Sequence, residues 1–148
     1  MKQPLQHELN DALASVLDEM QQRADELQST LEAERAALDG ADAEALDAAG
    51  NRKQALMQQL EQLDAERQLL QRQQPAGNAA RESRWAQVLV VLRHCHALNQ
   101  RNGSLVNQRL AQLRQALAIL TGHAGETGLY GSSGELHGSL RSKSLAAA

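Results

Sequence analysis

Aromatic side chains are nearly missing from this chain of 148 residues, in which phenylalanine does not occur and Trp85 and Tyr130 stand alone. Leucine and alanine supply most of the apolar content instead, a composition typical of long helices that pack along narrow stripes. Pockets that bind small molecules are usually lined by bulkier side chains. The composition therefore predicts a helical scaffold, and we expect neither catalytic activity nor a cofactor.

Cysteine and long apolar runs are scarce as well. Cys95 is the only cysteine, which excludes an internal disulfide and favours a reducing compartment. No segment approaches the roughly 20 consecutive apolar residues that cross a bilayer, and the first residues lack the apolar core of a signal peptide. We therefore expect a cytoplasmic protein without stable membrane insertion.

The residues that could carry chemistry do not form a site. His94, Cys95 and His96 are adjacent, but consecutive side chains on a helix point about 100° apart, so these three cannot share a metal ion or a substrate. Paired acids such as Glu32 and Glu34 alternate with Gln and Arg, which is typical of a solvated helix face. We assign no catalytic, cofactor-binding or metal-binding residue.

The spacing of the apolar residues predicts three long helices, over about 4–38, 42–74 and 79–121. The first has apolar residues at steps of four, four and three, and the second has a heptad stripe. Gly40 favours the end of the first helix, and Asp42 can cap the second. A connection this short folds the two helices back as an antiparallel hairpin.

Pro75 and Gly77 separate the hairpin from the third helix, because proline disfavours helix before it and glycine adds freedom. The predicted fold class is thus all-α: an elongated antiparallel helical hairpin or coiled coil with a third long helix packed along it. We expect residues 1–121 to form one elongated domain and residues 122–148, which are rich in Gly and Ser, to form a flexible C-terminal tail.

Charged residues interrupt two of the stripes. Arg35 is the one polar interruption assigned to the first helix, and Lys53 and Arg67 fall in the stripe of the second. The two bases could reach acids on the first helix, but we favour side chains that run along the edge of the stripe with their charges in water.

Two asparagines enter the stripe of the third helix, Asn99 and Asn102, and Gly103 follows directly. A buried amide costs stability unless it is hydrogen-bonded, but it can fix the register of packed helices. We favour a packing role over the alternative, a polar patch where a partner docks.

Charge is divided unevenly along the chain. Residues 1–66 hold fifteen acids and five bases, whereas residues 67–148 hold three acids and ten bases. We favour a basic third helix that packs against an acidic hairpin. The alternative is nucleic-acid binding, but the arginines lack the aromatic neighbours and the motifs that such proteins use, and we expect no nucleic-acid partner.

The end of the third helix and the tail carry a specific pattern. The run LNQRNGSLVNQRLAQLRQALAILTG spans Leu98–Gly122, and LYGSSG follows at Leu129–Gly134. Together they resemble the FlgN family of flagellar synthesis proteins, whose pattern is matched at Asn99, Asn102, Gly103, Gly122, Tyr130, Gly131 and Gly134.

The resemblance implies a cytoplasmic, non-enzymatic chaperone that binds hook-filament junction proteins, prevents their premature assembly and delivers them to the flagellar type III export apparatus. It implies that the C-terminal third binds this cargo and that Tyr130 contributes to docking on the export gate or ATPase complex. The partner-binding residues we expect are Asn99, Asn102, Gly103, Val106, Leu110, Leu113, Leu117, Leu120, Leu129, Tyr130, Gly131, Gly134, Leu136 and Leu140.

A second hypothesis is a structural coiled-coil adaptor that forms homo-oligomers, because stripes that pair within one chain also pair between chains.

Overall fold

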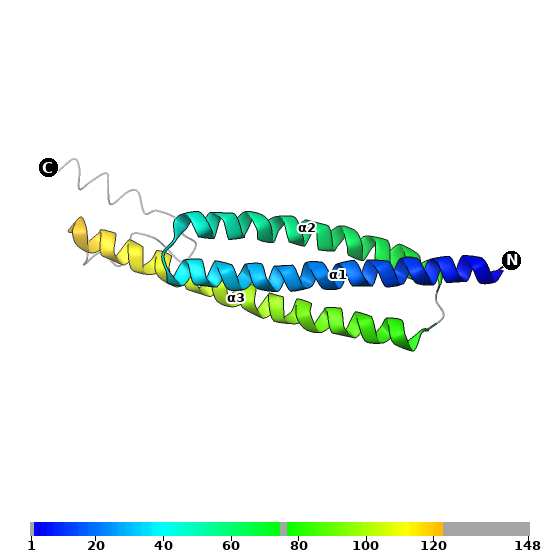
Figure 1. Cartoon of the computed structure of the whole chain (residues 1–148). Coiled ribbons are helices and arrows are strands. Elements are labelled where there is room, and N and C mark those ends of the chain that lie inside the picture. Colours follow the sequence, from blue (N-terminus) through cyan, green and yellow to red (C-terminus); the bar gives the residue numbers. More distant parts are fainter. Residues whose placement is uncertain (1, 75–76, 123–148) are drawn as a thin grey trace, which may run out of the picture. The chain divides into compact units, whose positions relative to one another are not determined.

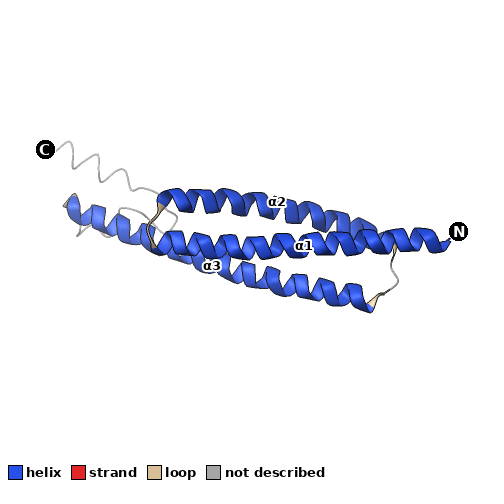
Figure 2. Ribbon diagram, in the orientation of Figure 1, coloured by secondary structure: helices blue, strands red, loops and turns tan. Residues whose placement is uncertain are grey.

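The computed structural model describes residues 2–74 and 77–122 of the chain. Within them it contains three α-helices and no strand, as predicted: α1 (Lys2–Asp39), α2 (Ala43–Gln73) and α3 (Ala79–Leu120) (Figures 1 and 2). By its internal contacts the chain divides into two units, Met1–Val106 and Asn107–Ala148. The first unit holds the hairpin and most of α3, and the second begins with the last turns of that helix.

A tight turn joins α1 to α2 and forms the predicted antiparallel hairpin. The Asp42 amide donates to the Ala37 carbonyl at 2.9 Å, and the Ala41 amide donates to the Leu38 carbonyl at 3.3 Å. This is the Schellman pattern, in which the residue after the helix cap adopts the left-handed conformation. Here that residue is Ala41, with φ at 52°. Glycine would be most favourable at this position, but Gly40 lies one position before it.

Asp42 caps α2 as predicted. Its Oδ1 atom accepts a hydrogen bond from the Ala45 amide at 3.0 Å, and its own backbone is extended, with φ at −92° and ψ at 96°. This geometry satisfies one of the amides that have no partner within the first turn of a helix.

The core of the first unit runs between the three helices, and the largest fully buried side chains are Leu13, Met20, Leu31, Leu56, Val88 and Asn102. The apolar spacing predicted these faces, because residues three and four positions apart share one side of a helix. Leu5 was assigned to the same stripe but is 61% exposed.

α3 lies along α1 in the same direction and in a constant register. The Cys95 thiol contacts the Ala24 carbonyl at 3.6 Å, and the Asn102 amide donates to the Leu31 carbonyl at 3.0 Å, in both cases 71 positions apart. This register explains the exposure of Leu5, since α3 begins only at Ala79. The predicted third helix along the hairpin is therefore confirmed.

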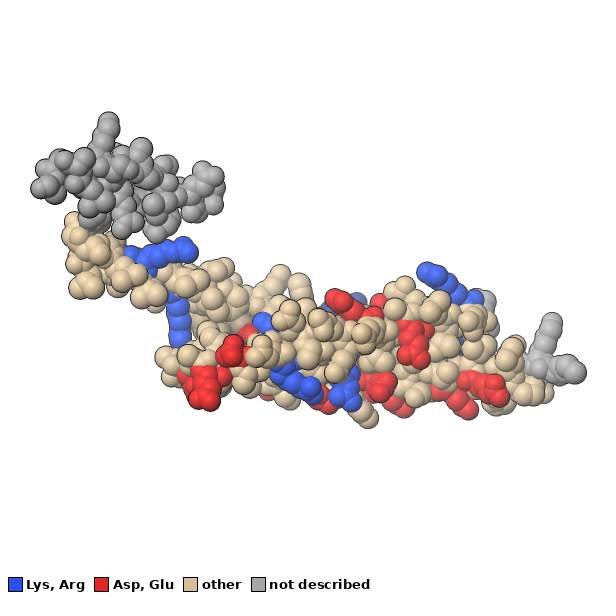
Figure 3. All heavy atoms as spheres, turned by 90° about the horizontal axis from the view of Figure 1, so that it is seen from above, with Lys and Arg blue, Asp and Glu red and all other residues tan. Residues whose placement is uncertain are grey.

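Ion pairs form between acidic and basic side chains on different helices. Arg84 of α3 pairs with Asp18 of α1 at 2.7 Å, and Arg52 of α2 pairs with Glu26 of α1. Figure 3 shows acidic and basic side chains next to one another on the visible face. The Arg84–Asp18 pair joins a base of the third helix to an acid of the hairpin, which favours the packing interpretation of the charge pattern. In the described residues no helix has an apolar stretch long enough to cross a membrane.

Candidate partner-binding surface

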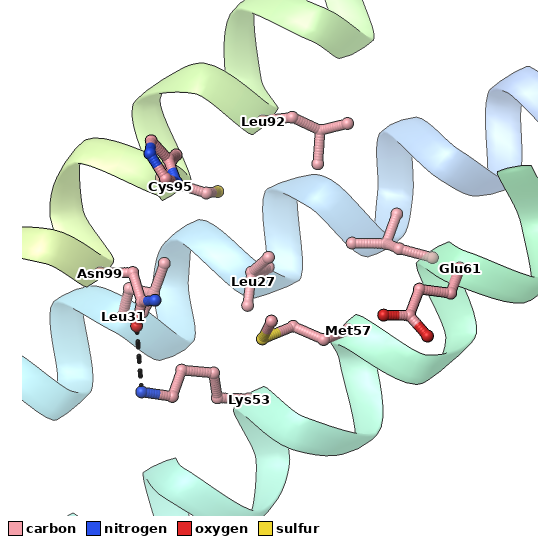
Figure 4. Close-up of a pocket in the computed structure, with 10 residues that line it drawn as sticks. Leu27, Leu31, Lys53, Met57, Glu61, Leu92, Cys95 and Asn99 are labelled. Carbon is pink, nitrogen blue, oxygen red and sulfur yellow. Dashed lines mark hydrogen bonds between the residues drawn. The ribbon is translucent and has the colours of Figure 1, made fainter.

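Four polar side chains from the three helices meet inside the first unit, and we call Glu34, Lys53, Asn99 and Asn102 the polar cluster. Lys53 Nζ lies 2.8 Å from Glu34 Oε2 and donates to Asn99 Oδ1 at 3.1 Å, a contact shown in Figure 4. Asn102 Nδ2 donates to Glu34 Oε1 at 2.9 Å as well as to the Leu31 carbonyl. The cluster thus joins α1, α2 and α3.

Burial corrects three assignments made from the sequence. Glu34 was placed on a solvated face but is only 6% exposed, and Arg35, which was assigned to the stripe, is exposed and pairs with Asp39. Lys53 was expected to keep its charge in water, but its ammonium reaches the acid on α1. The Glu34 carboxylate can be buried because the Lys53 ammonium neutralises its charge.

Arg67, the other base in the stripe of the second helix, contacts an acid on its own helix and an aromatic ring on α3. Its guanidinium pairs with Asp64 on its own helix at 2.9 Å and stacks over the Trp85 ring at 3.8 Å from the centroid. It therefore joins α2 to α3 through a cation–π contact, where the sequence predicted a charge in water.

The polar cluster specifies how α3 sits on the hairpin. Asn102 is 2% exposed, and its two hydrogen bonds form only in one register of α3 against α1. A slip of one turn would bury the Asn102 amide without its partners and remove one hydrogen bond from the Glu34 carboxylate, which is costly. Asn99 is half-buried and Gly103 is exposed. The structure thus gives Asn102 the packing role that was favoured for it.

Beyond Asn102 the apolar face of α3 becomes exposed. In the second unit we call Leu110, Leu113, Leu117 and Leu120 the leucine stripe; their exposed fractions are 43%, 56%, 50% and 82%. At about 100° per residue these four side chains fall within an arc of about 80° on one side of the helix. Such an arc is the width of a coiled-coil contact face.

The helices differ in length after the Asn102 contact. Beyond Leu31, whose carbonyl accepts from Asn102, α1 continues through residues 32–39, and α3 continues through residues 103–120. Val106, the last residue of the first unit, is already 36% exposed.

α3 ends at Leu120, close to the predicted end of the third helix. Gly122 has φ at 76°, a left-handed conformation that glycine adopts without steric cost. The Thr121 amide and hydroxyl both donate to the Leu117 carbonyl at 2.9 Å. These bonds satisfy a carbonyl that the end of the helix leaves without a partner. The remaining partner-binding residues predicted from the sequence lie outside the described residues: Leu129, Tyr130, Gly131, Gly134, Leu136 and Leu140.

The side chains of His94, Cys95 and His96 point in different directions, as their spacing on a helix predicts. Cys95 is 3% exposed, and both histidines are exposed. Burial raises the pKa of the Cys95 thiol, and the negative charge of Asp25 raises it further. Across residues 2–74 and 77–122 no group of three His, Cys, Asp or Glu side chains could hold a metal ion.

A cavity of about 240 Å³ opens beside Cys95 and is lined by side chains of α1, α2 and α3 (Figure 4). Leucine and methionine side chains are half of the residues that line it, and Lys53 and Asn99 of the polar cluster are also in the lining. Because Lys53 is already paired with Glu34, the cavity is best described as a gap in the packing next to the cluster.

Comparisons with known proteins bear on the whole chain. The family model described as FlgN protein matches residues 1–138. Two curated relatives named "Flagella synthesis protein FlgN", from Salmonella typhimurium and Salmonella typhi, are each 30% identical to the chain over 125 residues, which is 83% of the chain and 89% of the relative. No solved structure gives a significant match.

Proposed function

Because the chain belongs to the FlgN family, we propose that it acts in flagellar biogenesis as a cytoplasmic export chaperone, a binding protein rather than an enzyme. It binds hook-filament junction proteins, prevents their premature assembly and delivers them to the flagellar type III export apparatus. The family resemblance and the names of the relatives support the flagellar role. The exposed end of α3 supports the binding role.

The observation that carries the proposal is the leucine stripe. Its side chains are 43–82% exposed, although a helix face of this kind is normally buried against another helix. Covering them would contribute roughly 4–7 kcal/mol before the costs of association are subtracted. A surface of this strength suits reversible capture, since cargo can pass to the export apparatus by competition.

The stripe lies on a helix that is continuous with the first unit. The polar cluster holds α3 in one register on the hairpin, and α3 continues without interruption to Leu120. A partner therefore meets a helix that is already formed and loses less entropy in ordering it.

Co-purification with hook-filament junction proteins tests this proposal. Leu113→Gln combined with Leu117→Gln removes half of the stripe and keeps helix propensity, because glutamine is a good helix former. We expect affinity for the junction protein to fall roughly 50-fold. Undiminished capture by this double variant would overturn the proposal.

Ile119→Gln is the matched control, because Ile119 is 63% exposed on the same helix. It lies about 140° from the middle of the stripe. We expect this variant to bind as the wild type does. A loss equal to that of the double variant would show that the effect is not specific to the stripe.

Tyr130 has a second role in the proposal, docking on the export gate or ATPase complex, which rests on its place in the family motif. Tyr130→Ala should retain junction-protein binding and lose export, whereas Tyr130→Phe should retain binding and keep part of the export. Normal export of junction proteins by the alanine variant would count against this role.

Self-association is a second candidate function, because the exposed leucine stripe could equally pair with a second copy. It predicts a particle mass that rises with protein concentration in light scattering and falls in the Leu113→Gln and Leu117→Gln variant. A monomer at every concentration would remove this candidate.

A further inference from the structure

The end of the chain follows the leucine stripe directly. α3 ends at Leu120, and the described residues end at Gly122. We call residues 132–147, which lie outside the described residues, the tail segment. The stripe from Leu110 to Leu120 is about 15 Å long at 1.5 Å per residue, whereas residues 123–131 can span up to about 30 Å when extended. The connection is therefore long enough for the tail segment to reach any point of the stripe.

The sequence of the tail segment contains the apolar groups that such a contact needs. Ser132 and Glu135 have the spacing of a capping box, which favours the start of a helix. Leu136, Leu140 and Ala147 follow at positions that fall within an arc of about 40° on a helix. This apolar face would be about 17 Å long, which is close to the length of the stripe.

Attachment to the same chain favours the tail segment over other occupants of the stripe. A segment held by a short connection has a local concentration of a few mM, whereas a second copy of the protein reaches this value only in a solution equally concentrated. A contact with a Kd of about 1 mM would be too weak to hold two separate molecules together. At a local concentration of about 4 mM the same contact is formed in about 80% of the molecules.

We propose that the tail segment covers the leucine stripe of its own chain when no partner is bound, with Leu136 and Leu140 packed against the leucines of α3. This inference rests on the proposed function and adds a step to it, because cargo that binds the stripe must first displace the tail segment. An occupancy of about 80% lowers the affinity of the stripe for any other apolar surface about fivefold. Leu136 and Leu140, which were expected to bind a partner, thus make their first contact within the chain.

Hydrogen–deuterium exchange of the full chain without any partner tests the inference. Leu136→Ser combined with Leu140→Ser removes the leucines of the proposed contact. We expect the amides of residues 107–120 to exchange about fivefold faster in this variant than in the wild type, and those of α2 to be unchanged. Leu136→Met combined with Leu140→Met is the matched control, which keeps the apolar volume and should exchange as the wild type does. Equal exchange in the wild type and the serine variant would overturn the inference.

Substitutions in the stripe show whether the two segments act through one contact. In a chain that already carries Leu113→Gln and Leu117→Gln, the two serine substitutions should have little further effect on exchange over residues 107–120, because the contact is already lost. Equal acceleration in both backgrounds would mean that the serines act without the stripe, and the inference would fall.

Dilution distinguishes the tail segment from a second copy of the chain. A contact within one chain does not depend on protein concentration, so the difference between the wild type and the serine variant should be the same after tenfold dilution. A difference that disappears on dilution would assign the contact to a second copy and refute the inference.

Capture of junction proteins separates this inference from the proposed function. If the wild type captures junction proteins through the stripe but the serine variant exchanges as the wild type does, the chaperone proposal stands and the covering by the tail segment falls. If the serine variant exchanges faster but no junction protein is captured, the covering stands and the chaperone proposal falls.

Discussion

Replacing Lys53 by methionine removes the ammonium group from the polar cluster and keeps most of the side-chain volume. Glu34, which is 6% exposed, would then retain one side-chain hydrogen bond, from Asn102 Nδ2. Removing one partner of a buried ion pair costs about 3–5 kcal/mol. The Lys53 side chain is 25% exposed, so water can partly replace it, and we expect a loss of about 2–3 kcal/mol.

Guanidinium denaturation followed by circular dichroism measures this loss as a lower midpoint at unchanged slope. Arg52→Met is the matched control, because Arg52 also joins α2 to α1, through Glu26, but both side chains are 50% and 39% exposed. An exposed pair of this kind contributes less than about 1 kcal/mol.

Replacing the charged groups and the amide of the polar cluster together by apolar side chains should restore the stability that Lys53→Met alone loses. Glu34→Met, Lys53→Met and Asn102→Leu together remove every charge and the amide that contacts Glu34, so no buried ion lacks its partner. We expect this triple variant to recover to within about 1 kcal/mol of the wild type or to exceed it. A Lys53→Met variant as stable as Arg52→Met would refute the reasoning, since it would mean that Glu34 does not depend on Lys53.

Three further outcomes are expected from the same kind of measurement. Asp42→Ala should lower the free energy of unfolding by about 1 kcal/mol, because the Ala45 amide loses its cap; no change would contradict the cap. Ala41→Gly should raise it by about 0.5–1 kcal/mol, because φ at 52° strains alanine; a lower midpoint would count against this. Burial, and secondarily Asp25, raises the pKa of Cys95 above its ordinary value of 9.0. The folded state therefore holds this proton more tightly, so the associated stability is present below pH 9.0 and is lost as the pH rises above it. The stability of the wild type should then fall more steeply above pH 9.0 than that of Cys95→Ala, and parallel curves would show that the thiol does not contribute.

The helices and their packed faces were predictable because leucine spacing encodes them locally. The hairpin was predictable too, since Gly40 and Asp42 leave room for only a short turn. The left-handed residue of that turn is Ala41, one position after the glycine, because the hydrogen bonds of the turn fix which residue takes this conformation.

The buried charge could be placed only from the packed structure. Glu34 follows Leu31 by three positions and precedes Leu38 by four, which is the spacing of the α1 stripe. That spacing was the available signal, but an acid is rarely buried without a partner. The partner, Lys53, lies on another helix, and no local pattern links the two.

The leucine stripe shows the limit of sequence periodicity in a different way. Leu110, Leu113 and Leu117 have the same spacing as residues that are buried elsewhere, so the pattern indicates only that a face is apolar. Whether that face is covered is a property of the folded structure, in which these three side chains are 43–56% exposed.

Hydrogen–deuterium exchange of the full chain, with and without a hook-filament junction protein, tests the central claim most directly. An exposed helix end opens easily, and a partner that covers it slows amide exchange. The account predicts that protection rises over residues 107–120 on addition of the junction protein and stays unchanged along α2. Slower exchange along α2 with no change over residues 107–120 would contradict it.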